Sequence, residues 1–311
     1  MNIQQFKYIL AVAELKHFEL AAEKCFVTQS TLSTMISKFE DELGIQLFDR
    51  KKKPVALTNE GERIVNQLKI ILSGIDQLNE LKHELKGEVK GKLTIAVIPT
   101  IAPFLLPLFL QDFANQFPDL TIEVRELTTK EIIRQLKSRE LDVGILSTPI
   151  NDSEITEVDL YEEPFVLYDR ALKYADTIVP EMLDLSDLWL MEEGHCFRTQ
   201  VLKLCDIQQK LKKTTLNFDF KAGSIDSLLR FVRSNHASTL LPYLATTDFD
   251  PIEKCYVKRF EQPEPSRKVG LVVHHYFVKH KILNLLKEHI TNAVSDLLPE
   301  HHTVQLTIDP I

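Results

Sequence analysis

The stretch AAEKCFVTQSTLSTMISKFEDELGIQLFDR, residues 21–50, predicts two helices joined by a short turn. Thr28 stands where the N-cap of the second helix belongs, and Gly44 is a natural helix stop. Between these two positions runs one apolar stripe at helical spacing, made of Leu32, Met35, Ile36, Phe39 and Leu43. The stretch therefore predicts a helix-turn-helix, and an ordinary three-helix packing unit is the alternative.

The second helix begins with small polar side chains, which are those of Thr28, Gln29, Ser30, Thr31, Ser33 and Thr34. In helix-turn-helix proteins this end of the second helix meets base edges in the major groove, where Gln can read adenine with two hydrogen bonds. The basic side chains that we expect to bind phosphates are Lys38, Arg50, Lys51 and Lys52. The extended segments 45–50 and 53–58 flank the basic turn and predict a wing.

Together with LTNEGE, residues 57–62, the opening stretch resembles the winged helix-turn-helix of LysR-type transcriptional regulators. The resemblance is carried by a small-residue helix, a Thr-Gln-Ser turn, Glu-x-Glu-Leu-Gly-x-x-Leu-Phe-x-Arg and Thr-x-x-Gly. It implies that the partners are double-stranded promoter DNA and RNA polymerase, and that the chain regulates transcription and is not an enzyme.

Length, charge and composition limit the classes of protein to which the chain can belong. The chain has 311 residues, which favours two or three folding units, and its net charge of −8 argues against a protein coated in nucleic acid. A small DNA-binding module on an acidic body remains compatible with this charge, because DNA binding depends on the local electrostatic field at the contact surface. No apolar run reaches the roughly 18 residues of a membrane span, and the first residues do not resemble a secretory signal. We therefore expect no membrane segment and a cytoplasmic location.

A long amphipathic helix is predicted from Thr58 to about Leu85. Its apolar residues recur at spacings of three and four, and they are Ile64, Leu68, Ile71, Leu72, Ile75, Leu78 and Leu81. A lone helix cannot bury such a stripe, so we expect it to pair with its copy in a dimer, with docking on its own body as the alternative. The resemblance also implies a dimerising helix here, and we expect a tetramer. KGEVKG, residues 86–91, predicts a hinge.

The rest of the chain alternates strands and helices, which predicts parallel βαβ units in two α/β lobes with a cleft between them. A late strand and helix, from residue 268 onward, are expected to return to the first lobe. The regulatory domain of LysR-type proteins resembles a periplasmic binding protein, and the order of elements fits it. The expected domains are a DNA-binding domain at 1–58, a linker helix and hinge at 59–89, and a regulatory domain at 90–311.

Two of the four cysteines, Cys196 and Cys205, stand nine positions apart. Buried packing is one interpretation of the pair, and a zinc site or a Cys-His hydrolase fits the spacing poorly. A redox switch is another, because His195 and Arg198 flank Cys196, and positive neighbours favour the thiolate that attacks peroxide. If the segment is helical, about 13 Å separates the two residues, so a disulfide requires it to unwind.

Four segments resemble the peroxide-sensing members of the LysR-type family, at residues 93–107, 125–133, 192–205 and 263–272. The resemblance implies that Cys196 is the peroxidatic cysteine, that Cys205 resolves it in a disulfide, and that hydrogen peroxide is the signal. The pocket residues expected from it are Pro99, Thr100, Thr129 and His195, with Arg198 and His274 beside the thiol. It implies no cofactor and no metal.

Two departures from the family pattern accompany this resemblance. The family has an arginine after the Gly-Leu-Val strand where this chain has His274, and the glycine-rich turn before Thr239 is here residues 235–238. The second departure puts a small-molecule site at that turn in doubt. A LysR-type regulator with a small organic effector in its interlobe cleft is the main alternative. A solute-binding or catalytic two-lobed protein is a third, which the helix-turn-helix argues against.

Overall fold

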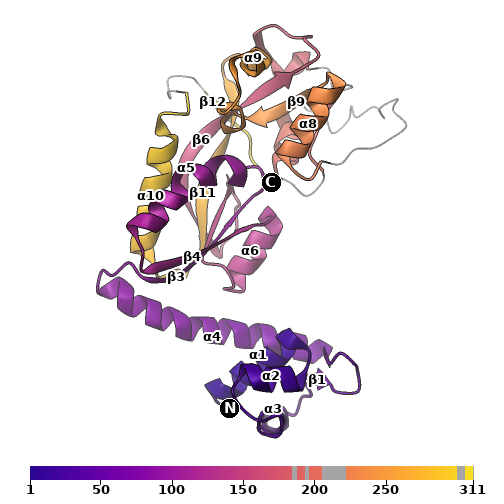
Figure 1. Ribbon diagram of the computed structural model, residues 1–311, viewed down its shortest axis with the longest axis vertical. Helices are drawn as coiled ribbons and strands as arrows, with labels where there is room; N and C mark the ends of the chain where they lie inside the picture. The colour runs from indigo at the N-terminus through magenta and orange to yellow at the C-terminus, as the bar shows by residue number, and fades with distance from the viewer. Residues whose placement is uncertain (184–187, 193–195, 205–221, 300–304, 311) are drawn as a thin grey trace. The chain divides into compact units, whose positions relative to one another are not determined.

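The computed structural model describes residues 1–183, 188–192, 196–204, 222–299 and 305–310 (Figure 1). The chain forms two compact units, one of Met1–Leu85 and one that starts at Lys86, with Ser138–Glu140 grouped with the first. The predicted domain boundaries at 58 and 89 stay predictions. None of the described helices is long and apolar enough to cross a membrane.

The first unit contains the predicted helix-turn-helix and wing. Its elements are α1 (Ile3–Leu15), α2 (Phe18–Lys24), α3 (Gln29–Leu43) and the antiparallel strands β1 (Phe48–Asp49) and β2 (Ala56–Leu57). As the sequence predicts, Thr28 caps α3 by accepting a hydrogen bond from the Thr31 amide (3.2 Å), and Gly44 ends it in the left-handed region (φ 68°). Leu32, Ile36 and Phe39 of the apolar stripe are fully buried in the core of this unit.

The long helix α4 (Asn59–Leu85) follows β2 and confirms the predicted amphipathic helix. Thr58 starts it, because its hydroxyl accepts from the Gly61 amide (2.8 Å) and donates to the Gln46 carbonyl (2.7 Å). A Cβ at Gly61 would lie 2.2 Å from the Leu47 carbonyl oxygen, so only glycine fits there. The Thr-x-x-Gly motif thus packs the start of α4 directly against the wing.

The second unit begins with a parallel sheet of β3 (Gly91–Val97), β4 (Leu120–Glu126) and β5 (Val143–Thr148), in the order β4-β3-β5. The connecting helices are α5 (Ala102–Gln116) and α6 (Thr129–Lys137). The late strand β11 (Glu264–His274) pairs with β5, and the helix α10 (His280–Ser295) packs its apolar side into the same core. The predicted return of the chain to the first lobe is confirmed.

A second core belongs to the second lobe of this unit. The 15-residue strand β6 (Ile155–Asp169) pairs with β11 along its first part and with β9 (Ser238–Pro242) and β10 (Val257–Phe260) along its last part. Because β6 takes part in both lobes, one continuous sheet joins two separate cores (Figure 1). The predicted two-lobed α/β fold is confirmed, but β6 runs antiparallel to β9, β10 and β11, so the expected parallel pairing does not extend to the centre of the second lobe.

The remaining elements of the second lobe are short. They are β7 (Thr177–Ile178), η1 (Pro180–Met182), β8 (Leu188–Trp189), α7 (Cys196–Leu204), α8 (Ile225–Asn235), η3 (Tyr243–Thr246) and α9 (Pro251–Lys254). The chain closes with β12 (Gln305–Thr307), which pairs in parallel with the start of β11. This last strand was not predicted from the sequence.

Candidate DNA interface and thiol site

The N-terminal end of α3 presents the polar side chains that the sequence singles out. Those of Thr28, Gln29, Ser30, Thr31, Thr34 and Lys38 are exposed, and Ser33 is half-buried. The Thr28 hydroxyl lies 3.0 Å from that of Ser30 and 2.8 Å from that of Thr31, so the capping threonine also orients two of its neighbours. The first turn of α3 is therefore an ordered edge of hydrogen-bonding groups.

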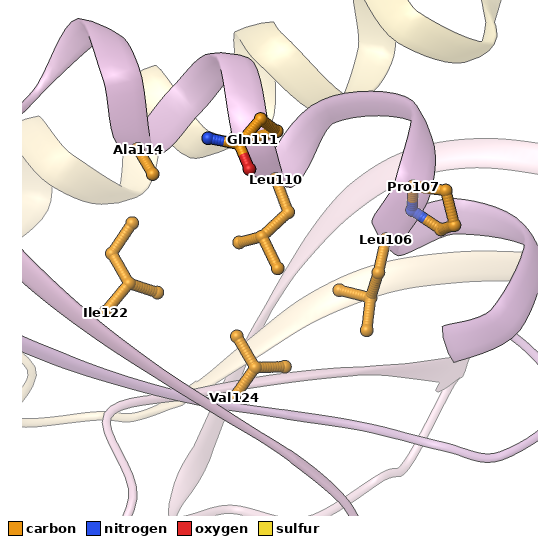
Figure 2. Close-up of a pocket in the computed structure, with 7 residues that line it drawn as sticks. All are labelled: Leu106, Pro107, Leu110, Gln111, Ala114, Ile122 and Val124. Atoms are coloured by element: carbon orange, nitrogen blue, oxygen red, sulfur yellow. The ribbon is translucent and has the colours of Figure 1, made fainter.

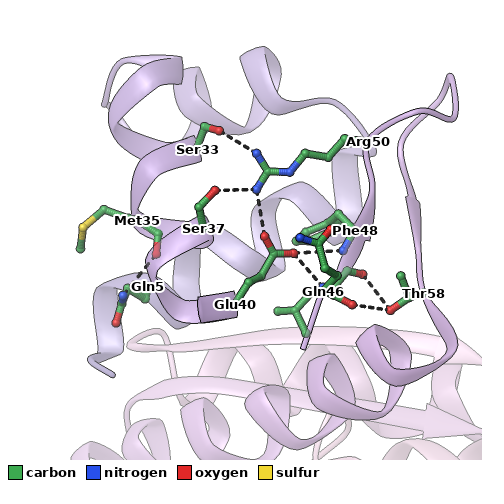
Figure 3. A network of polar contacts seen from close by, with 10 residues as sticks. Gln5, Ser33, Met35, Ser37, Glu40, Gln46, Phe48, Arg50 and Thr58 are labelled. Carbon is green, nitrogen blue, oxygen red and sulfur yellow. Dashed lines mark hydrogen bonds and ion pairs between the residues drawn. The ribbon is translucent and has the colours of Figure 1, made fainter. Parts of the chain in front are cut away.

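Arg50 binds α3 instead of extending into solvent (Figure 3). Its guanidinium donates to the Ser33 hydroxyl (3.1 Å), the Ser37 hydroxyl (3.0 Å) and a Glu40 carboxylate oxygen (3.0 Å). The other Glu40 oxygen accepts from the amides of Leu47 (2.7 Å) and Phe48 (3.3 Å). This geometry makes Arg50 a tether between wing and recognition helix, and its predicted phosphate contact stays a prediction.

The basic turn of the wing lies between β1 and β2. Lys51, Lys52 and Lys53 are all exposed there, and the nearest carboxylate to the Lys52 ammonium is that of Asp49, 4.0 Å away. An exposed pair at this distance neutralises little charge. The turn therefore carries the positive field that a phosphate backbone requires.

An apolar groove of about 400 Å³ lies on the first lobe (Figure 2). Five side chains of α5 line one wall and Ile122 and Val124 of β4 line the other, and Gln111 supplies the only polar group among them. None of the predicted pocket residues takes part in this groove, and it offers no charged group to hold an organic acid or amine.

The thiol of Cys196 lies where the two cores of the second unit meet. Cys196 is the first residue of α7, is 9% exposed and packs in the core of the first lobe. The next residue, Phe197, packs in the core of the second lobe against Phe165, with ring centroids 5.5 Å apart. The position at a helix N-terminus favours an anion, because the first amides of the helix carry partial positive charge.

A buried arginine lies next to this helix. Arg267 and Glu163 are each 1% exposed and form an ion pair of 2.7 Å between paired positions of β11 and β6. The guanidinium also donates to the Thr100 hydroxyl (3.0 Å) and carbonyl (3.0 Å), and its central carbon lies 5.6 Å from the centroid of the Phe197 ring. Arg267 therefore connects Thr100 with α7.

The second oxygen of Glu163 accepts from the Leu244 amide (2.8 Å), so this buried carboxylate is bound on both sides. The nearby Tyr161 hydroxyl is buried with no hydrogen-bond partner among the described residues. Burial is the main cause that raises the pKa of Tyr161 well above its ordinary value, and the Glu163 charge adds to it. The site thus combines a buried guanidinium that is paired with a carboxylate and a phenol that keeps its proton.

Thr100 and Thr129 follow the carboxyl ends of the adjacent parallel strands β3 and β4, where ligands of α/β folds usually bind. A hydrogen bond from the Leu127 amide to the Val97 carbonyl (3.1 Å) joins the two segments. The Thr129 hydroxyl is buried and has no hydrogen-bond partner in the described part of the chain. The same holds for the hydroxyls of Ser147 and Thr148. A buried unpaired hydroxyl costs about 1–3 kcal/mol, and a small polar ligand would offset that cost.

The other predicted pocket residues lie as follows. Pro99 is half-buried beside Thr100, and Arg198 donates to the Met191 carbonyl (2.8 Å). His274 pairs with Ile155 at the opposite end of β11, seven residues or about 23 Å of strand from Arg267. The structure therefore does not bring His274 to Thr100. His195 and Cys205 lie outside the described residues.

The sequence reading missed Arg267 and Glu163. A signal was present, because each is a charged residue at the edge of an otherwise apolar strand, in SRKVGLVV and YEEPFVLY. Opposite charges in two buried strands favour pairing, but only the register of β6 against β11 identifies which carboxylate and which cation meet.

Comparison with known proteins agrees with this architecture. Residues 3–62 match the bacterial regulatory helix-turn-helix protein family of lysR type, and residues 86–294 match the LysR substrate binding domain. The chain is 34% identical over 276 residues to the DNA-binding transcriptional dual regulator OxyR of Escherichia coli, and the alignment covers 88% of this chain and 89% of that protein.

Two solved structures are also similar. A full-length OxyR from Pseudomonas aeruginosa with a cysteine-to-aspartate substitution aligns at a TM-score of 0.73 and 28% identity, over 94% of this chain and 98% of that one. An H2O2-bound cysteine-to-serine mutant of OxyR from Corynebacterium glutamicum aligns at a TM-score of 0.59 and 26% identity, over 95% and 93% of the two chains.

Proposed function

Because the chain belongs to the LysR family of transcriptional regulators, we propose that it binds promoter DNA and regulates transcription in response to hydrogen peroxide, with Cys196 as the sensor. The protein is a DNA-binding regulator and not an enzyme. We also propose a cytoplasmic location, with RNA polymerase as a further partner.

The DNA-binding role follows from the winged helix-turn-helix. The exposed start of α3 enters the major groove, where Gln29 and Ser33 read base edges, and Lys51 and Lys52 of the wing bind phosphates. Arg50 keeps the wing and α3 in register, so the two contacts act as one surface.

Self-association follows from α4. Ile71, Leu78 and Leu85 are 40%, 69% and 80% exposed and recur every seven residues, which is the spacing of a coiled-coil seam. A second copy of α4 is the occupant that buries them, and dimers of dimers give the expected tetramer.

The single observation that carries the sensing role is the buried Arg267–Thr100 contact beside the helix that Cys196 begins. In the sensing step the thiolate of Cys196 attacks one peroxide oxygen, an S–O bond forms and the O–O bond breaks. The departing hydroxide takes a proton and leaves as water, and the sulfur remains as sulfenic acid. Arg267 and the hydroxyls of Thr100 and Thr129 are the groups that would stabilise the charge on the departing oxygen.

Thiol trapping with mass spectrometry tests this function. Treatment of the reduced protein with a small excess of H2O2 is expected to link Cys196 to Cys205 within one chain, and dithiothreitol is expected to reverse the link. Peptide maps in which Cys196 and Cys205 stay free while Cys25 or Cys255 oxidises would refute the sensing role.

A further inference from the structure

The C-terminal segment 305–310 contacts both the strands that carry the buried ion pair and the helix α7 that Cys196 begins. β12 pairs with β11 from Glu264 to Ser266, directly before Arg267, and the Ile308 amide extends this pairing by donating to the Ser266 carbonyl (2.8 Å). The Thr307 hydroxyl donates to a Glu162 carboxylate oxygen (2.7 Å), next to Glu163. The segment is therefore anchored to the two strands that carry the buried ion pair.

The same segment holds α7. Gln200 is fully buried and stands one helical turn after Cys196, and its amide nitrogen donates to the Ile308 carbonyl (2.6 Å). The Lys203 ammonium lies 3.3 Å from the Asp309 carbonyl, and the Ile308 side chain packs against the second core. We call residues 305–310 the tail strand.

We propose that the tail strand is a positioning element that holds α7 helical and thereby favours the thiol form of the sensor over the disulfide. The inference rests on the proposed peroxide function for its chemistry, and on the Gln200–Ile308 and β12–β11 contacts for its geometry. It assigns Gln200 a role in switching that the pocket residues do not have.

Disulfide formation requires α7 to change its conformation. Condensation of the Cys196 sulfenic acid with the Cys205 thiol forms one S–S bond, breaks the S–O bond and releases water. A disulfide requires Cα atoms less than about 7 Å apart, whereas nine residues of helix span about 13 Å. Since α7 is helical from Cys196 to Leu204, it has to unwind, and Gln200 then loses its bond to the tail strand.

Every contact between the tail strand and α7 therefore stabilises the thiol form alone. Removal of these contacts shifts the equilibrium towards the disulfide and makes the disulfide harder to reduce. The loss of one or two such hydrogen bonds corresponds to about a fivefold to tenfold change in the equilibrium constant, or about 20–30 mV for a two-electron couple.

The test compares the full chain with a truncation that ends at residue 304 and with Gln200→Ala. The thiol–disulfide equilibrium is measured by thiol trapping in dithiothreitol buffers of graded composition. Both variants are expected to favour the disulfide about fivefold to tenfold more than the full chain does. Asp309→Asn is the matched control and should behave as the full chain does, since it alters an exposed side chain and keeps the backbone carbonyl.

A synthetic peptide of the tail strand sequence, QLTIDP, is expected to restore the original equilibrium to the truncation. If circular dichroism shows that the truncation does not fold, the thiol–disulfide equilibrium of Gln200→Ala alone decides the proposal. Equilibrium constants that stay within twofold of the full chain in Gln200→Ala, or that move towards the thiol, would overturn the proposal.

A second measurement separates this inference from the proposed function. In the reduced protein, amide hydrogen exchange in α7 should become faster in the truncation and in Gln200→Ala, whatever peroxide does. A full chain that forms no disulfide with peroxide while α7 exchange accelerates in both variants would refute peroxide sensing and leave the positioning role standing. Unchanged exchange in α7 would refute the positioning role.

Discussion

Arg50 of the wing and Glu40 of the recognition helix form an ion pair of 3.0 Å in which the Glu40 side chain is only 4% exposed. The carboxylate that holds Arg50 also holds the amides of Leu47 and Phe48, so one buried glutamate fixes the wing at two places. The position of the wing relative to α3 thus depends on one buried carboxylate.

Substitution Arg50→Lys is expected to weaken DNA binding without changing its salt dependence. A lysine ammonium cannot reach Ser33, Ser37 and Glu40 together, because it lacks the planar fork of the guanidinium. The free energy of unfolding should also fall, by about 1 kcal/mol, and the melting temperature with it.

The control is Lys52→Ala, which should weaken binding to all sequences alike and lower the slope of log K against log salt by about one. The measurement is a titration of fluorescent operator DNA at several salt concentrations. If Arg50→Lys lowers the salt slope as much as Lys52→Ala does, Arg50 is a phosphate contact and not a tether.

Substitution Leu78→Glu is expected to shift the protein towards monomers. The side chain is 69% exposed in the single chain, so its cost arises only when a second α4 packs on the seam. The exposed neighbour Asn79→Glu adds the same charge off the seam and serves as the control. Sedimentation velocity at micromolar concentration measures the change, and an unchanged assembly in Leu78→Glu would contradict the coiled-coil seam.

Substitution Thr100→Val is expected to slow the oxidation of Cys196 at least tenfold, since it removes a hydroxyl that accepts from Arg267 and that we propose stabilises the departing oxygen. The variant keeps the shape of the side chain and should fold, with a stability loss of about 1–3 kcal/mol. Rapid quenching with a thiol-trapping reagent measures the rate. Thr156→Val, at an exposed position of β6, should oxidise at the rate of the unmodified protein.

Substitution Tyr161→Phe is expected to protect the protein from alkali. The folded-state pKa of Tyr161 is raised, so above about pH 10 the unfolded chain releases this proton while the folded chain keeps it, and stability falls as pH rises. Phenylalanine removes this loss and costs little at pH 7, because the buried hydroxyl has no partner among the described residues.

Urea unfolding at pH 7 and pH 10.5 checks this prediction, with the exposed Tyr276→Phe as control. A Tyr161→Phe variant whose stability falls with pH as steeply as that of the parent would show that this phenol does not limit alkaline stability.

The emission of Trp189 is expected to report switching. Its ring lies 4.4 Å from that of Phe231, and its carbonyl accepts from the Thr239 hydroxyl (2.7 Å), seven residues before Cys196. Unwinding of α7 should change this environment, so peroxide should shift the emission and dithiothreitol should restore it. In Cys205→Ser, oxidation stops at the sulfenic acid, so the emission should show little lasting shift. A full shift in this variant would mean that the sulfenic acid alone causes the conformational change.

The helix-turn-helix was predictable because its determinants are local. The cap at Thr28, the stop at Gly44 and the apolar stripe between them act within one helix, and all three lie where the periodicity indicates. The contact of Arg50 with α3 was not predictable, since it depends on a buried glutamate ten residues away in the sequence.

At the thiol site, too, local features were predictable and long-range contacts were not. Thr100 and Thr129 could be placed at the strand ends from alternation and resemblance, whereas Arg267 could not, because its environment depends on the register of two strands about 100 residues apart. The resemblance implied His274 beside the thiol, and the structure places it seven residues along β11 from Arg267. The tail strand pairs with β11 about 40 residues earlier in the chain, and its sequence carries no local pattern that predicts this pairing.

The ion pair of Arg267 and Glu163 lies where β6 passes from the first core to the second, since positions before it pair with β11 and positions after it pair with β9. The Arg267 guanidinium also donates to Thr100 of the first lobe and lies over the Phe197 ring of the second lobe. A substitution of Arg267 would therefore remove the hydrogen bonds to Thr100 and the ion pair at the junction of the two cores at once, so peroxide sensitivity and the packing of the two lobes could not be engineered separately there.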